Sequence, residues 1–440
     1  MPPAQQRLIK FIQFFCDLAA LLLATWPLHH WNWSSSKLLV IAMALGVYRL
    51  TISLAHYSVR QPFWDELRDM LGTVIIMGSL HAALLKSVHS DLPSETIICA
   101  WTLALIALPL SRNLLRQLLR RLGLWQQPVI LVGNGPNSRD AIKVLHSDSV
   151  LGYRVCQQTH PDEDGRWLEA HPHALVAVAL EPEAGQLLDQ TLRQLTAASR
   201  DYLIVPPMRG LPMQGLTSLH TLSHEILLLR ASNHLKQLPS RLLKGLVDYV
   251  GALIMLCFIW PVLLMLSIRL AFEAGPILYW HERIGKNGKP FMCPKFRTMA
   301  PDADARLEAL LNTCANSRKE WEERRKLRDD PRITPLGRLL RETSLDELPQ
   351  LWCVLKGEMS LVGPRPVTQV ELSHYGENVS YYRQVLPGIT GLWQVSGRSE
   401  ADYPTRVALD VWYVRNWSLW TDVVILLKTV GVVLRREGAR

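Results

Sequence analysis

Two adjacent carboxylates are the first residues of this sequence whose types could do chemistry. Asp346 and Glu347 stand in the run Thr343–Gln350, shortly after Arg341 and before Pro349. If a helix starts with Asp346 as its N-cap, Pro349 falls within the first turn, where proline is tolerated. A helix start also attracts anions through its free N–H groups and its dipole. The pair is therefore a candidate site for phosphate chemistry.

The same pair has a purely structural interpretation. Ser344 and Glu347 match a capping box, although Pro349 would then cost a hydrogen bond inside the helix. An acidic pair beside basic residues also suits Mg²⁺, which takes one or two carboxylates plus phosphate oxygens. One carboxylate could instead attack phosphorus as a nucleophile. Spacing alone leaves the helix cap and catalysis both open.

Basic residues surround the acid pair in the sequence. Between His281 and Thr298 the cations are Arg283, Lys286, Lys289, Lys295 and Arg297. Glycines and prolines break this stretch, which predicts a loop or a short strand. Convergent Lys and Arg side chains suit phosphate oxygens, and a patch facing anionic lipid headgroups is the alternative. Arg365, held between two prolines, would suit a phosphoryl clamp.

The composition limits which elements can carry such a site. The 440 residues are 48% hydrophobic with a net charge of +9, which excludes intrinsic disorder and favours an anionic partner: nucleic acid, an acidic membrane or a phosphorylated substrate. The 7 cysteines are scattered without a C-x-x-C pattern, so neither a zinc site nor a disulfide framework is indicated.

The first quarter of the chain reads as membrane helices. The apolar stretches are residues 8–26, 37–55, 70–88 and 96–110. A spanning helix needs roughly 20 mainly apolar residues, and the placement of Lys and Arg predicts four crossings with both ends of this region in the cytoplasm. Trp26, Trp31 and Trp33 would form an interfacial belt. The alternative, a buried soluble bundle, is disfavoured because the stretches lack a polar face.

A middle region, residues 126–230, alternates short apolar strands (129–132, 174–180 and 202–205) with helices (141–145 and 187–198), which predicts a small parallel α/β sheet. The turn Gly133–Ser138 follows the first strand, where a Rossmann domain holds a pyrophosphate. Ser138 replaces the third glycine, and no clear acidic residue ends the next strand. These departures favour a structural or regulatory domain over dinucleotide binding.

A fifth apolar segment, Leu246–Leu270, is interrupted by Pro261. A full crossing is the default for this length, but positive charges on both sides favour two cytoplasmic ends. Proline bends a helix, so the segment can enter the bilayer, kink and return. A cytosolic substrate for the acid pair requires this second arrangement. The later segment Ser418–Arg436 has the pattern of an interfacial amphipathic helix or of an ordinary packed one.

Four motifs occur together in the last third of the chain: KFRTM, TSLDELPQ, SLVGPRP and PGITGLWQVSGR, at residues 295–299, 343–350, 360–366 and 387–398. In this order they resemble the bacterial sugar transferases, the monotopic polyprenyl-phosphate hexose-1-phosphate transferases. The whole chain resembles the long form of that family, and the stretches 60–64, 209–212, 223–225 and 432–436 resemble its galactose-transferring members, which start O-antigen or capsule repeats.

The resemblance implies a fold and a location. It implies a membrane α-helical bundle of four transmembrane helices (residues 1–111), a Rossmann-like cytoplasmic α/β domain (126–230), and an α/β monotopic transferase domain with a re-entrant helix kinked at Pro261 (241–440). Members often have Ser before that proline, where this chain has Trp260. The implied location is the bacterial inner membrane, with the N-terminus and the catalytic domain in the cytoplasm.

The resemblance also implies a reaction. UDP-hexose and undecaprenyl phosphate would give undecaprenyl-diphosphate-hexose and UMP, with Asp346 as nucleophile and Mg²⁺ ligand and Glu347 as its partner. The implied substrate- and phosphate-binding residues are Lys295, Arg297, Arg341, Arg365 and Asp410. Galactose is favoured over glucose, a homodimer is compatible with the long form, and no nucleic-acid partner is expected. The rival interpretations are a glycosyltransferase that releases UDP, an NAD-dependent nucleotide-sugar epimerase or dehydratase, and a non-enzymatic assembly scaffold.

Overall fold

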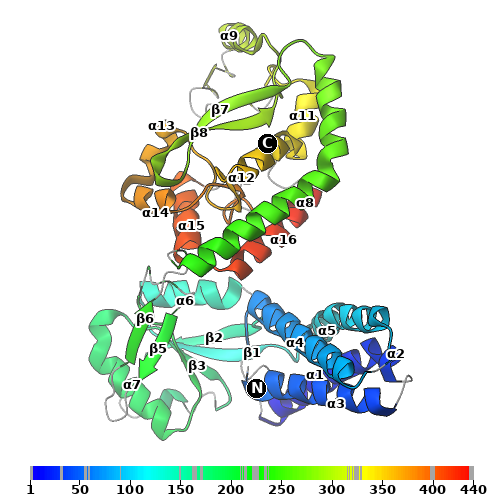
Figure 1. The fold of residues 1–440 in the computed structure, drawn as a ribbon. Helices are drawn as coiled ribbons and strands as arrows, with labels where there is room; N and C mark the ends of the chain where they lie inside the picture. Colours follow the sequence, from blue (N-terminus) through cyan, green and yellow to red (C-terminus); the bar gives the residue numbers. More distant parts are fainter. Residues whose placement is uncertain are drawn as a thin grey trace. The chain divides into compact units, whose positions relative to one another are not determined.

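The computed structural model describes residues 3–29, 33–53, 57, 60–89, 91–147, 150–160, 166–168, 172–208, 210, 212, 216–220, 227–231, 235, 237–314, 316, 318–319, 321, 327, 330–396 and 402–435. The chain divides into two compact units, Met1–Arg209 and Gly210–Arg440 (Figure 1). The helices at the start and the first sheet thus share one unit. The division into three domains stays a prediction.

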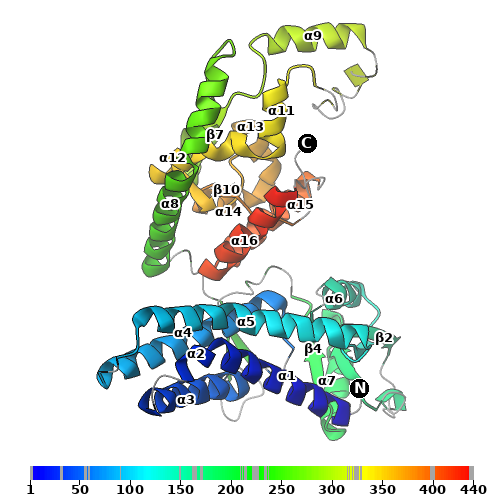
Figure 2. The same ribbon diagram turned by 90° about the vertical axis from the view of Figure 1, so that its right-hand side faces the viewer.

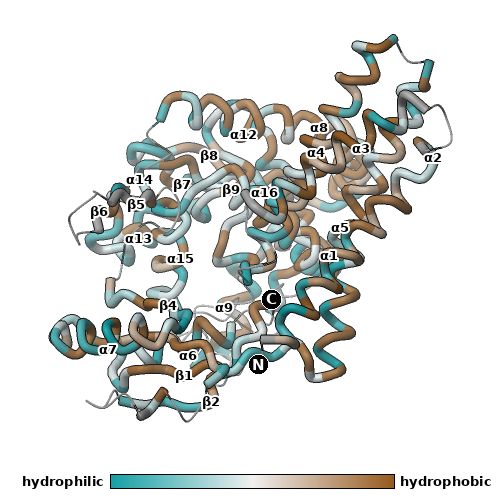
Figure 3. Tube along the Cα trace, turned by 90° about the horizontal axis from the view of Figure 1, so that it is seen from below, coloured by the Kyte–Doolittle hydropathy of each residue, from teal (hydrophilic) through white to brown (hydrophobic). Residues whose placement is uncertain are grey.

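Long helices open the first unit. They are α1 (Pro3–Ala24), α2 (Trp26–His29), α3 (Trp33–Tyr48), a π-helical turn η1 (Arg49–Ser53), α4 (Phe63–Ser87) and α5 (Ser94–Arg121). Their shared core includes Leu39, Met77 and Ala104, all buried. Apolar turns, drawn brown, recur along α3 and α4 in Figure 3.

Three helices among the described residues are long and apolar enough to cross a membrane: α4, α5 and α8 (Leu238–Ala271). α3 has only 16 residues, and α1 carries Arg7, Lys10 and Asp17 along its length. The fourth predicted stretch, residues 96–110, proved to be part of a 28-residue helix. Its last turns were not predicted as part of a span because they contain arginines.

A buried ion network joins α1, α4 and α5. The guanidinium of Arg112, 2% exposed, donates to the carboxylate of Asp17 and, at 2.9 Å, to that of Glu66. Arg116 donates to the second oxygen of Glu66, and the hydroxyl of Tyr57 donates to Asp17 at 2.7 Å. Since each buried charge is paired, the three helices gain a fixed register, and removing one partner would leave an uncompensated charge.

The second half of this unit is a parallel sheet. Its strands are β1 (Gln127–Val132), β2 (Tyr153–Thr159), β3 (Leu175–Val178) and β4 (Tyr202–Ile204), in the order β2-β1-β3-β4. The connections contain α6 (Pro136–Ser147), η2 (Arg166–Leu168), η3 (Pro182–Ala184) and α7 (Gly185–Ala197). The predicted parallel α/β sheet is confirmed. β2 was missed because this edge strand is largely polar.

The second unit contains α8, two hairpins and a set of short helices (Figures 1 and 2). Its strands are β5 (Leu216–His220), β6 (Leu227–Ala231), β7 (Leu278–Ile284), β8 (Pro290–Phe296), β9 (Ser360–Val362) and β10 (Gly388–Thr390). Its helices after α8 are η5 (Lys286–Gly288), α9 (Ala303–Thr313), α11 (Pro335–Glu342), η6 (Leu345–Gln350), α12 (Leu351–Leu355), α13 (Gln369–Leu372), η7 (Ser373–Asn378), α14 (Val379–Gln384), α15 (Tyr403–Arg415) and α16 (Leu419–Arg435).

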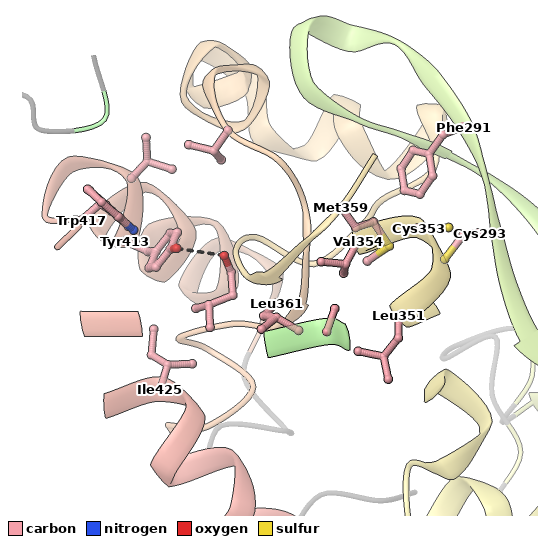
Figure 4. Packing of buried hydrophobic residues seen from close by; sticks show 14 of the residues in the cluster. Phe291, Cys293, Leu351, Cys353, Val354, Met359, Leu361, Tyr413, Trp417 and Ile425 are labelled. Carbon is pink, nitrogen blue, oxygen red and sulfur yellow. Dashed lines mark hydrogen bonds between the residues drawn. The ribbon is translucent and has the colours of Figure 1, made fainter. Parts of the chain in front are cut away.

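The core of this unit contains a buried polar network. Asp422 of α16 accepts hydrogen bonds from Tyr413 at 2.7 Å, from Trp417 at 3.0 Å and from Lys244 of α8 at 2.7 Å. Figure 4 shows Tyr413 among the buried hydrophobic residues of this core. Its hydroxyl also donates a 2.9 Å hydrogen bond to the carbonyl oxygen of Val362. These bonds hold α8, α15 and α16 around β9.

α8 is a single helix of 34 residues, about 51 Å long at 1.5 Å per residue. Pro261 lies inside it, and the helix is visibly bent part way along in Figure 1. A proline removes one backbone hydrogen bond and pushes the preceding turn away. The bend is thus compatible with the predicted kink, and re-entry stays a prediction.

Replacing Pro261 with alanine restores the missing N–H and should straighten α8. We expect a straight helix to cross the membrane, so that cysteines introduced at Gln237 and Ala274 label from opposite sides with a membrane-impermeant maleimide. In the parent protein, lacking the other exposed cysteines, both should label from the cytoplasmic side. Cytoplasmic labelling of both positions in Pro261→Ala would contradict the role of the proline.

Candidate functional site

The β7–β8 hairpin places cations on one face. Its antiparallel register pairs Arg283 with Phe291 and Tyr279 with Lys295. Asn287 and Gly288 in the connection both have positive φ, 58° and 76°, as tight hairpin turns require. Because side chains alternate along a strand, the odd-numbered Arg283, Cys293 and Lys295 share a face. The stretch predicted as loop or short strand is therefore a regular hairpin.

The acid pair lies in η6, a 3₁₀-helix that begins at Leu345 and continues into α12. The predicted start with Asp346 as N-cap was wrong, and the alternative start at Ser344 is present but without its capping box. Ser344 is the N-cap residue but has a left-handed backbone, φ 55°, and makes no capping hydrogen bond with its side chain, whereas a capping side chain needs an extended backbone. Asp346 therefore stands inside the first turn and not at its cap.

Glu347 binds two cations from different elements. One of its oxygens lies 2.6 Å from the ammonium of Lys295 on β8 and 3.5 Å from the guanidinium of Arg365 in the loop after β9. Burial alone would raise the pKa of Glu347, but Arg365 and Lys295 outweigh it and hold that pKa below its usual value. Glu347 is thus an ionised carboxylate with one oxygen, Oε1, shared between two cations.

Asp346 differs from its neighbour. No ion pair joins its carboxylate to another described residue. Burial, reinforced by the negative charge of Glu347, raises the pKa of Asp346 to about 6, against the opposing charges of Lys295 and Arg341. The guanidinium of Arg341 is anchored by a 2.9 Å hydrogen bond to the hydroxyl of Thr298. Asp346 therefore keeps its oxygens available in a cationic environment.

The Arg365 loop is held by close backbone packing. β9 and β10 pair in parallel, and the amide of Gly388 donates to the carbonyl of Pro364 at 2.8 Å. A Cβ at Gly388 would stand 2.1 Å from the nitrogen of Gly363, so only glycine fits here. The glycine-rich motif at residues 387–398 therefore contains β10, the strand that packs against β9 and the Arg365 loop.

Two predicted site residues make other contacts. Arg297, 7% exposed, has its guanidinium 3.8 Å from the carboxylate of Glu273, just after α8. Asp410 is buried on α15 and accepts a 2.7 Å hydrogen bond from the hydroxyl of Tyr375, and burial raises its pKa to about 7. No hydrogen bond or ion pair among the described residues joins either side chain to the acid pair, and their substrate roles stay predictions.

A pocket beside the acid pair includes residues not assigned to the site from sequence. It is lined by Lys295, Glu347 and Arg365 together with Arg283, Cys293, Gln350, Pro366, Ile389 and Gln394. Arg283 also pairs with Glu371 at 2.8 Å. Arg283 and Lys295 share a face only through the hairpin register, which pairs Tyr279 with Lys295, and the sequence alone did not predict that register. Gln350 and Gln394 lie inside motifs but give no independent sequence signal.

The donor set can be tested against Mg²⁺. No group of three His, Cys, Asp or Glu residues suited to hold a metal ion occurs within the described parts of the chain. Mg²⁺ needs no such cage, because it keeps waters and binds one or two carboxylates plus substrate phosphates. The unpaired carboxylate of Asp346 fits that kind of coordination.

The glycine turn of the first unit is filled by the chain itself. The carboxylate of Glu181 accepts a 2.8 Å hydrogen bond from the amide of Asn137, at the start of α6. A Cβ at Gly135 would stand 2.1 Å from the same carboxylate. An internal anion therefore occupies the place where a Rossmann domain binds a pyrophosphate.

Some motif residues fall outside the described parts of the chain. These are Trp31, Arg209, Leu211, Ser223–Glu225, Gly397, Arg398 and Arg436.

Comparison with known proteins gives a consistent picture. The family model of the bacterial sugar transferases matches residues 239–436. The chain is 40% identical over 405 residues to the UDP-galactose-lipid carrier transferase of Erwinia amylovora, covering 88% of this chain and 85% of the relative.

Two further relatives bear on the substrates. The undecaprenyl-phosphate galactose phosphotransferase of Salmonella typhimurium is 40% identical over 409 residues, 88% of this chain and 85% of its own length. The UDP-glucose:undecaprenyl-phosphate glucose-1-phosphate transferase of Caulobacter vibrioides is 35% identical over 226 residues, 49% of this chain and 79% of its own length.

Replacing Glu181 with alanine removes the carboxylate that caps α6. An N-terminal cap contributes about 1 kcal/mol, so hydrogen exchange in the first turn of α6 should become about fivefold faster, as measured by mass spectrometry. Glu183→Ala, an exposed neighbour in η3, is the matched control and should leave exchange unchanged. Equal exchange in wild type and Glu181→Ala would show that the carboxylate does not fill this turn.

Proposed function

The chain belongs to the bacterial sugar transferase family and is a sugar-phosphate transferase, and we propose that it transfers hexose-1-phosphate from a UDP-hexose to undecaprenyl phosphate with release of UMP. This reaction is the first membrane step of O-antigen, capsule or exopolysaccharide synthesis. Support comes from two relatives at 40% identity over 88% of the chain, whose names give a galactose donor or an undecaprenyl phosphate acceptor.

The proposed sugar is galactose. Both of those relatives are named for galactose and match the chain over most of its length. The relative named for glucose matches about half of it. UDP-glucose is the alternative donor.

The proposed mechanism rests on a difference between the two acids, because one is ion-paired and the other is not. Glu347 is occupied by Lys295 and Arg365, whereas Asp346 has no ion-pair partner within the described residues. Asp346 is therefore the nucleophile. A carboxylate oxygen of Asp346 attacks the β-phosphorus of the donor, the bond to the bridging oxygen breaks, and UMP leaves with that electron pair. The lipid phosphate then attacks the same phosphorus and releases the Asp346 carboxylate.

The cations make this attack feasible. A carboxylate and a diphosphate repel each other unless their charge is neutralised. Lys295, Arg341 and Arg365 lie around the acid pair and would bind non-bridging phosphate oxygens, and they favour the charge that develops in the transition state. Bound Mg²⁺, held by Asp346 and the diphosphate, would supply further charge neutralisation. Arg297 is assigned a phosphate contact and Asp410 a supporting role in substrate binding.

The membrane arrangement completes the proposal. Four helices at the start cross the bacterial inner membrane, α8 enters and returns, and the N-terminus and catalytic unit are cytoplasmic. The α/β sheet is a Rossmann-like domain without a nucleotide cofactor at its glycine turn, because Glu181 fills that turn. This observation disfavours an NAD-dependent epimerase or dehydratase. Membrane lipid is a partner, and self-association as a homodimer is compatible with the reaction.

A product assay tests the function. Purified protein in detergent is incubated with undecaprenyl phosphate, Mg²⁺ and UDP-galactose, and UMP is separated from UDP. We expect lipid-dependent UMP. Asp346→Asn should lower its formation by at least about 10³-fold, because the nucleophile is lost, while insertion into membranes is unchanged.

Asp304→Asn on α9 is the control for this variant, since Asp304 lies away from the acid pair in sequence and is exposed. UDP as product would mean transfer of the sugar alone. UMP formation at the wild-type rate by Asp346→Asn would exclude Asp346 as nucleophile. Turnover with UDP-glucose alone would make glucose the donor.

The pH profile should report on the acid pair. The nucleophile must be ionised, so kcat/KM should fall as the pH decreases through about 6, the pKa of Asp346. Glu347 is a negative neighbour that raises this pKa, and therefore Glu347→Gln should move the acid limb to lower pH, whatever its effect on the maximal rate. Glu377→Gln, on an exposed turn of η7, should leave the limb in place. An acid limb at the same pH in Glu347→Gln and wild type would contradict the coupling.

A further inference from the structure

A second cavity lies within the first unit, among residues of the helices and the parallel sheet. It encloses about 510 Å³, within the range of small-ligand sites. Its lining includes Lys10, Arg60, Gln61, Glu66, Arg116 and Asp201. The lining comes from α1, from both sides of the start of α4, from the end of α5 and from the sheet.

The cavity has a small excess of positive charge, because its lining holds three cations, Lys10, Arg60 and Arg116, and two carboxylates, Glu66 and Asp201. Arg60 stacks over the ring of Trp125, 4.6 Å from its centroid, and no carboxylate among the described residues pairs with it. Burial, with the nearby cation Arg116, lowers the pKa of Arg60 to about 10. Glu66 is already shared between Arg112 and Arg116. Arg60 donates to the carbonyl of Leu151 at 2.7 Å, and neither it nor Lys10 has a carboxylate partner among the described residues, so an anion that enters the cavity would meet both cations.

Two buried polar atoms in the same cavity have no hydrogen-bond partner among the described residues. They are the Nε of Arg116, a residue that is 3% exposed, and the Oε1 of Gln61. Unsatisfied buried polar atoms are costly and rare in folded proteins. One donor and one acceptor beside unpaired cations suit a ligand that both accepts and donates hydrogen bonds, as a phosphate monoester does.

The cavity is at the opposite edge of the sheet from the glycine turn. Gln127, Tyr153 and Leu175 stand at the first residues of β1, β2 and β3. The carboxyl edge, where open α/β sheets bind ligands, is filled by Glu181. The amino edge is the one that combines a cavity with cations in this unit.

We propose that this cavity binds a phosphate group, and that it is a ligand site separate from the acid pair. The phosphate contacts Lys10, Arg60 and Arg116, and the remaining volume accommodates the group that the phosphate is attached to. Two sources have this chemistry: a soluble nucleotide such as UMP, and an anionic lipid headgroup, since α4 and α5 are long enough to reach a membrane.

Binding measurements on the full-length protein in nanodiscs test the proposal. UMP is titrated by calorimetry in discs of phosphatidylcholine alone and in discs that also contain phosphatidylglycerol. Native mass spectrometry counts the phosphatidylglycerol molecules that stay bound. Lys10→Gln and Arg60→Gln each remove one charge-assisted contact and should weaken the ligand of the cavity by about tenfold. Lys143→Gln, an exposed cation on α6, is the matched control.

Each outcome decides the question. A class of UMP sites weakened by both cavity variants, and not by the control, supports a soluble ligand. Retention of phosphatidylglycerol that depends on Lys10 and Arg60 supports a lipid headgroup. Unchanged UMP affinity together with unchanged lipid retention in both variants overturns the proposal. Lys10 makes no ion pair with another described residue, so its variant remains informative if Arg60→Gln destabilises the unit. The comparison does not depend on the proposed reaction.

Discussion

The shared carboxylate of Glu347 is the contact on which the transferase site depends. It brings Lys295 from the β8 strand and Arg365 from the loop after β9 to a single point. Without it, two cations on different elements would repel each other. The same contact separates the roles of two neighbouring acids, because the engaged Glu347 is ionised while the burial of Asp346 raises its pKa. Local chain geometry, a 3₁₀ turn entered through a left-handed serine, places both acids beside these cations.

Buried hydrogen bonds hold the helices and the arginine loop around this site. The carboxylate of Asp422 accepts hydrogen bonds from Tyr413, Trp417 and Lys244. The bond from Lys244 connects α8 to α16. Asp248, one turn further along α8, accepts from the hydroxyl of Ser360 and from the amide of Leu361. Apolar contacts are not directional and allow two helices to shift along each other, whereas a fully hydrogen-bonded buried network allows one relative position of its elements. These bonds therefore fix the position of the arginine loop relative to α8.

Sequence patterns predicted the elements that carry a strong local signal. The apolar runs of β1, β3 and β4 identified the sheet, and the order of the motifs identified the family and the acid pair. The edge strand β2 was missed because its polar residues resemble a loop. The helix start with Asp346 as N-cap was wrong because the turn begins earlier, through Ser344 in a left-handed conformation that its residue type rarely favours. The contacts of Arg283, Gln350 and Asp410 depend on tertiary packing, which local spacing does not encode.

The thiol of Cys293 has a consequence for inhibitor chemistry. It lines the pocket beside Glu347, yet it is 1% exposed, and burial raises its pKa to about 11 against the opposing charge of Lys295. Electrophilic warheads react with thiolates, which this cysteine does not form at neutral pH. Covalent compounds directed at this thiol would therefore be slow to react. Reversible anions that match the Lys295 and Arg365 pair offer the better starting point for drug design.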